Sequence, residues 1–172
     1  ILQNLGEVNY GLYGVVAGII TMFTFLNGSL AAASSRYITV ELAKGDFKQL
    51  NKTFSTAFAI HLILAIIIII LAETIGLWFL HNKMVIPPDR MYASQWVYQL
   101  SILSCFFSIT QVPYGALIVA HENMKIFAYT AIVDVVFKLL LAYSLSVAPI
   151  DTLIFHAVLL CIMSVGMNLF YR

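Results

Sequence analysis

Asp134 and Lys138 are the only charged residues in an apolar stretch from position 126 to 147. At this spacing the two side chains share one face of a helix and can form an ion pair, with the acid ahead of the base as such pairs prefer. A charge near the centre of a bilayer costs about 2.5–3.5 kcal/mol even on the lenient insertion scale, so intramembrane charges usually face a bundle interior or a wet cavity. The pair is therefore a candidate for binding an ion or a charged ligand. A self-neutralised structural pair is the alternative.

Gln111 and Pro113 lie in the second half of an uncharged segment that ends at Ala120. Proline removes a backbone donor and clashes with the preceding turn, so we predict a kink there. The kink exposes a carbonyl that water, an ion or a ligand can satisfy. Gln111 either lines the same cavity as the charged pair or bonds a neighbouring helix. Arg36, at the mouth of an earlier apolar segment, either attracts an anionic headgroup or anchors the helix at the cytoplasmic surface.

The composition indicates that lipid is the solvent for much of this surface. The 172 residues are 62% hydrophobic and 10% charged, with a mean hydropathy of +0.95, whereas an average soluble domain is roughly a quarter charged. No lysine- or arginine-rich run occurs, so we expect no nucleic-acid partner. The four histidines are too far apart in sequence to form a metal motif.

Five apolar segments are each long enough to cross a bilayer, which takes roughly 20 helical residues. We therefore predict an all-α integral membrane protein, a bundle of about five transmembrane helices forming one domain over residues 1–172. The predicted spans are 11–33, 56–80, 92–120, 126–147 and 152–171.

The most polar stretch, residues 34–55, has the pattern of a solvated helical hairpin. Gly45 suits the end of one helix and Asp46 suits the N-cap of the next. Gln49 follows three residues later, as in a capping box. These signals predict a hairpin whose tip is Gly45–Asp46.

The distribution of lysine and arginine predicts the orientation. Two basic residues, Lys83 and Arg90, lie on one side of the predicted spans. Because more lie on the other side, we expect the hairpin that carries Arg36 to Lys52 to be cytoplasmic, in a multi-pass protein of the plasma (inner) membrane. The amino terminus would then be outside without a signal peptide, so we expect a preceding helix and a segment truncated at both ends. The six residues on the basic side are Arg36, Lys44, Lys48, Lys52, Lys125 and Arg172.

Enzyme signatures are absent from the sequence. No nucleophile-elbow, phosphate-loop or zinc-protease pattern occurs, and the predicted loops are too short to hold a soluble catalytic domain. We expect neither an enzyme nor a cofactor.

Several short segments resemble bacterial polysaccharide flippases of the multidrug/oligosaccharidyl-lipid/polysaccharide exporter superfamily. Residues 5–13 (LGEVNYGLY) are similar to the segment after the first helix of these proteins, and residues 35–46 are similar to their first cytoplasmic hairpin. Each motif is short, but their order and spacing cover nearly the whole chain. The other matching segments are 73–78 (ETIGLW), 112–116 (VPYGA) and 120–122.

The resemblance implies a two-lobe transporter of twelve to fourteen helices that moves a lipid-linked oligosaccharide across the inner membrane by alternating access. Its products would serve lipopolysaccharide, capsule or exopolysaccharide assembly. The five predicted spans would be helices two to six, within one lobe. In such proteins cationic cavity residues are thought to meet the diphosphate of the lipid carrier. Lys138 is the best-placed candidate, with Asp134 as its partner or as an ion-coupling carboxylate, and the Pro113 kink would help the lobe to rock.

Three other functions compete with this interpretation. A multidrug/cation antiporter of the same superfamily would use a cavity carboxylate such as Asp134. A membrane enzyme of glycan assembly would need large outer loops, which are absent. A non-transporting membrane fragment is the third alternative. The resemblance specifies neither the sugar, the coupling ion nor the oligomeric state.

Overall fold

The described part of the chain is built from long helices and contains no strand. The computed structural model describes residues 7–83, 86, 88–122, 124–144 and 152–171. The all-α prediction is confirmed, and the helices are α2 (Glu7–Lys44), α3 (Phe47–Leu71), the π-helical turn η1 (Ala72–Gly76), α4 (Leu77–Asn82), α5 (Pro88–Ala120), α6 (Met124–Ser144) and α7 (Thr152–Tyr171).

Three helical stretches within the described residues are long and apolar enough to cross a membrane: Phe47–Asn82, Arg90–Ala120 and Leu153–Tyr171. The predicted spans 11–33 and 126–147 coincide with parts of α2 and α6. That all five segments cross the membrane stays a prediction. The end of span 126–147 and Arg172 lie outside the described residues.

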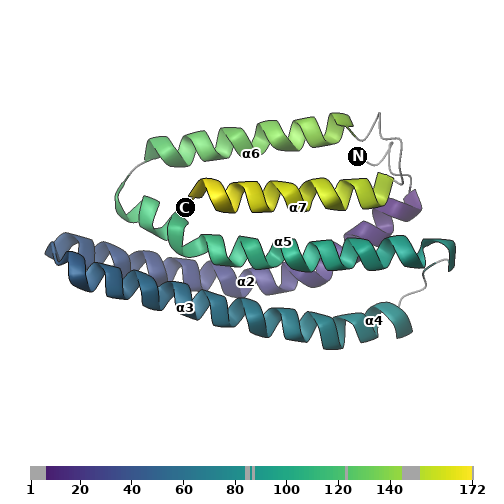
Figure 1. The fold of residues 1–172 in the computed structure, drawn as a ribbon, viewed down its shortest axis with the longest axis horizontal. Coiled ribbons are helices and arrows are strands. Elements are labelled where there is room, and N and C mark those ends of the chain that lie inside the picture. Colours follow the sequence, from purple (N-terminus) through teal and green to yellow (C-terminus); the bar gives the residue numbers. More distant parts are fainter. Residues whose placement is uncertain (1–6, 84–85, 87, 123, 145–151, 172) are drawn as a thin grey trace.

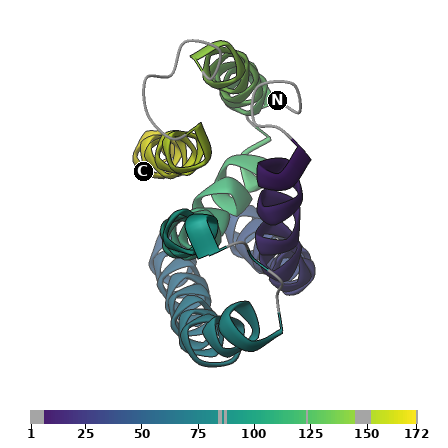
Figure 2. The ribbon, with the colours of Figure 1, turned by 90° about the vertical axis from the view of Figure 1, so that its right-hand side faces the viewer.

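Helix α5 is the centre of the bundle, in contact with α2, α3 and α7 (Figure 1). One core cluster joins Ala72 and Leu80 to Val97 of α5 and Leu153 of α7. A second cluster joins Ile38 of α2 to α5. Several of the buried positions are alanines, and small residues allow membrane helices to approach closely. The end-on view in Figure 2 agrees with Figure 1 in placing α6 at the edge of the bundle, farthest from α3.

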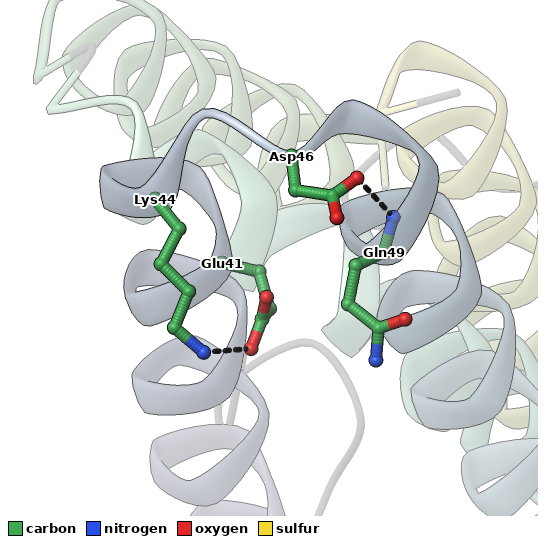
Figure 3. A network of polar contacts seen from close by, with 4 residues as sticks. All are labelled: Glu41, Lys44, Asp46 and Gln49. Atoms are coloured by element: carbon green, nitrogen blue, oxygen red, sulfur yellow. Dashed lines mark hydrogen bonds and ion pairs between the residues drawn. The ribbon is translucent and has the colours of Figure 1, made fainter.

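The hairpin predicted at residues 34–55 forms with its tip at Gly45–Asp46, and its arms are direct continuations of α2 and α3. Gly45 has a φ of +74°, which glycine adopts without the cost that a Cβ imposes. The Asp46 carboxylate accepts hydrogen bonds from the backbone N–H groups of Lys48 and Gln49, both at 3.0 Å. Figure 3 shows the bond from Gln49. The carboxylate therefore satisfies two donors that the first turn of α3 leaves unpaired.

The ends of α5 also follow from local chemistry. The helix begins at Pro88, four residues before the predicted boundary at 92. Proline suits this position because the first helical residue needs no N–H donor. After Ala120 the chain turns through Glu122, whose φ is +53°. The N–H of Glu122 donates to the carbonyl of Val119 at 3.0 Å, and α6 begins at Met124.

The outward surface of the bundle is apolar. On α3 the exposed side chains include Ile63, Ile67 and Ile70, and on α6 they include Ile132 and Val136. Soluble monomers rarely expose continuous apolar patches of this kind. Lipid contact accounts for this surface, and the helices satisfy their backbone polar groups internally, as a membrane requires.

Candidate functional site

The Asp134–Lys138 pair forms as the spacing predicts. The Nζ atom of Lys138 lies 2.6 Å from Oδ2 of Asp134, near the middle of α6. The lysine side chain is 60% exposed and the aspartate side chain 31% exposed. The accessible end of the pair is therefore the ammonium group, and the carboxylate lies closer to the protein.

The surroundings of the pair are apolar. Val135, Val136 and Leu139 are exposed on the same helix. Helix α6 lies at the edge of the bundle in both views (Figures 1 and 2), and more than half of the Lys138 side chain is exposed.

The other predicted site residues are not joined to this pair. Gln111 is half-buried in α5, Arg36 is exposed on α2, and Pro113 is fully buried inside α5. Within the described ranges, the structure has no hydrogen bond or ion pair from Gln111 or Arg36 to the charged pair. The structure thus brings together two of the four polar candidates, and the kink at Pro113 stays a prediction.

A buried amide that the sequence interpretation missed links α7 to α5 close to Pro113. The Nδ2 atom of Asn168 donates to the Phe107 carbonyl at 2.8 Å and to Oγ1 of Thr110 at 3.1 Å. Asn168 is 2% exposed. Its presence in a mostly apolar helix was the available signal, because a buried amide needs a partner.

Tyr171, one turn further along α7, continues this polar contact to α6. Its hydroxyl donates to Oγ1 of Thr130 at 3.1 Å, and Thr130 is itself buried. Hydrogen bonds between membrane helices add specificity to otherwise similar apolar faces. The two contacts therefore fix α7 between α5 and α6.

A second missed feature joins the π-helical turn η1 to α5. The Tyr98 hydroxyl donates to the Ala72 carbonyl at 2.8 Å, and a Cβ atom at Gly76 would overlap that hydroxyl. Beside it, Gln99 donates to the Glu73 carboxylate at 3.2 Å. Single π turns often occur at functional positions of helices, and this one aligns α3 and α4 with α5.

The space between α6 and α7 is an apolar cavity of about 420 Å³. Val133 and Phe137 of α6 face Met163 and Phe170 of α7 across it. Such a lining, apolar apart from Ser144, suits hydrocarbon. No cluster of histidine, cysteine or carboxylate side chains that could hold a metal occurs within the described ranges.

Long apolar helices, an apolar outer surface and a charged pair within one helix define a polytopic α-helical membrane protein. The MatE family model matches residues 1–144, which is most of the chain, and the chain belongs to the MatE family. This family consists of membrane transporters of the multidrug/oligosaccharidyl-lipid/polysaccharide exporter superfamily, not of enzymes. The superfamily expected from the sequence motifs is thereby confirmed. No curated protein and no solved structure matches the chain.

Proposed function

We propose that this chain is part of an inner-membrane flippase for lipid-linked oligosaccharides that serves lipopolysaccharide, capsule or exopolysaccharide assembly. The observation that carries the proposal is the accessible ammonium of Lys138 within an apolar helix. An intramembrane cation is costly and is therefore usually functional. A diphosphate headgroup would supply the anion that this group attracts. The family match supports transport, and the chain would correspond to about helices two to six of one lobe.

The ion pair is suited to an exchange of partners. In an apolar environment the two charges attract each other more strongly than they would in water, so a diphosphate replaces the Asp134 carboxylate only by offering the ammonium group an anion of at least equal strength. Charge-assisted hydrogen bonds to phosphate are stronger than neutral ones. Once displaced, the Asp134 carboxylate is available to bind a proton or a cation, which would couple transport to an ion gradient.

The remaining candidates have supporting roles in this proposal. Arg36, near the hairpin end of α2, attracts the anionic headgroup as it enters. Gln111 contributes a polar side chain to the wall of the pathway. Pro113 removes one backbone hydrogen bond from the second half of α5, and this weak point lets the lobe bend between its two states.

Export of cationic drugs is the second candidate, because the family match fits it equally well. In that case Asp134 would bind the cation and Lys138 would have to leave it. The exposed fractions of the two side chains argue against binding of a cation by Asp134, since Lys138 is about twice as exposed as Asp134. A ligand therefore meets the ammonium before it reaches the carboxylate.

Deletion of the gene in its host separates the two functions. The flippase proposal predicts loss of surface glycan, accumulation of the lipid-linked intermediate and unchanged sensitivity to cationic drugs. Complementation with the intact gene should restore the glycan. Normal surface glycan together with increased drug sensitivity would overturn the proposal and favour the exporter.

A further inference from the structure

The two arms of the hairpin enclose a groove that the transport proposal does not use. Its volume is about 340 Å³, and it lies between the last turns of α2 and the first turns of α3. The lining residues are Leu30, Ala33, Ser34, Tyr37, Gln49, Lys52, Thr53, Thr56, Ala57 and Ile60.

The polarity of this groove changes along its length. Near the hairpin tip the lining is polar, with Lys52 and Thr53 on α3. Beyond Ser34 and Thr56 the lining becomes apolar, with Leu30 and Ala33 on α2 and Ala57 and Ile60 on α3. Lys52 and Ile60 are separated by about 12 Å of helix. A change from charge to hydrocarbon over this distance matches the passage from lipid headgroups into the bilayer core.

The polar end of the groove carries the positive charge of Lys52, which forms no ion pair with an acid among the described residues. The two nearby acids are engaged elsewhere: Glu41 pairs with Lys44 at 2.8 Å, and Asp46 caps α3 through two backbone N–H groups (Figure 3). Within the described ranges, Lys52 has no ion pair. Among the described residues that line the groove, Lys52 is the one with a charged side chain.

We propose that the groove between α2 and α3 binds one anionic phospholipid, with the lipid phosphate at Lys52 and Thr53 and an acyl chain along Ala33, Ala57 and Ile60. A lysine near an anionic membrane surface contributes to lipid binding, whereas a neutral or zwitterionic headgroup gains less from it. The bound lipid contacts both arms, so it stabilises the hairpin. This site is independent of the charged pair on α6 and of the transported substrate.

Thermal unfolding of the purified full-length protein tests whether the groove requires an anionic headgroup. In neutral detergent, added phosphatidylglycerol should raise Tm, while phosphatidylcholine and inorganic phosphate should not. Lys52→Gln should weaken the apparent phosphatidylglycerol affinity about fivefold, the loss expected for one lysine near the surface. Lys48→Gln is the matched control, because Lys48 is exposed one turn before Lys52 in α3 and does not line the groove.

A steric variant tests the hydrocarbon end without changing charge. Ala33→Phe should fill the groove and abolish the Tm increase, whereas Ala32→Phe should leave it intact, since Ala32 is exposed and outside the lining. Equal weakening by Lys52→Gln and Lys48→Gln would mean diffuse surface electrostatics and would overturn the proposal. So would an equal response to phosphatidylcholine or to inorganic phosphate, or an unchanged response in Ala33→Phe.

Discussion

The contact between Gly76 and Tyr98 requires both a residue without a side chain at position 76 and a tyrosine hydroxyl at position 98. The missing side chain at Gly76 leaves room for the Tyr98 hydroxyl. That hydroxyl reaches the Ala72 carbonyl, which also accepts the N–H of Leu77 across the π turn. A tyrosine buried in a membrane helix needs such a partner for its hydroxyl. The pair therefore sets how closely α3 and α5 approach.

Gly76→Ala should destabilise the protein by about 1–3 kcal/mol, because the new Cβ must displace the Tyr98 hydroxyl from a packed interface. Adding Tyr98→Phe removes the overlapping atom, so the double variant should lose less stability than the two single losses added together. Denaturant unfolding in detergent micelles measures all three. Gly166→Ala is the control, since the added Cβ enters open space there. A stability loss in the double variant equal to the sum of the two single losses would contradict the proposed contact.

At the scale of single helices, the helix ends that could be predicted from the sequence are those determined by residues next to one another in the chain. Gly45 and Asp46 determine the hairpin tip through a backbone angle and two capping hydrogen bonds. These signals are local, so they can be found in the sequence. The π turn has no comparable local pattern, and the length of the apolar segment predicted only an ordinary membrane span over residues 56–80.

The contacts between helices could not be predicted in the same way. Asn168 and Phe107 are 61 residues apart, and Tyr98 and Ala72 are 26 apart. Apolar helices in lipid have many rotations of similar energy, because lipid tails are as apolar as the side chains. A single sequence therefore indicates that Asn168 needs a partner and leaves open which helix provides it.

Asn168→Leu should lower the free energy of unfolding by about 0.6–1.7 kcal/mol, the range measured for hydrogen bonds between membrane helices. The loss follows because the Phe107 carbonyl and the Thr110 hydroxyl both lose the Asn168 amide as a partner. Ser164→Ala is a suitable comparison, since the Ser164 hydroxyl donates within its own helix to Cys161. An equal loss in both variants would show that Asn168 does not join α5 to α7.

At the scale of the whole molecule, charge is distributed unequally between the two ends of the bundle. The hairpin tip and the turn between α5 and α6 lie at the same end (Figure 1). Among the described residues this end carries Arg36, Lys44, Lys48, Lys52 and Lys125, and the opposite end carries Lys83 and Arg90. Cytoplasmic loops carry the excess of basic residues. We therefore expect the hairpin to be cytoplasmic.

Cysteine labelling tests this orientation. Both native cysteines, Cys105 and Cys161, are buried, so background labelling should be low. With a membrane-impermeant maleimide, Lys83→Cys should react in intact spheroplasts, and Lys48→Cys should react only after the membrane is opened. The reverse pattern would contradict the orientation and place the hairpin outside.

Transport of a lipid-diphosphate oligosaccharide in proteoliposomes tests the role of Lys138 most directly. The variant Asp134→Asn/Lys138→Gln removes both charges and leaves no unpaired charge in the membrane. Loss of a charge-assisted contact to phosphate should slow flipping by about ten- to a hundredfold, whereas Lys125→Gln on the same helix should flip at the unmodified rate. Wild-type flipping by the doubly neutral variant would contradict the account.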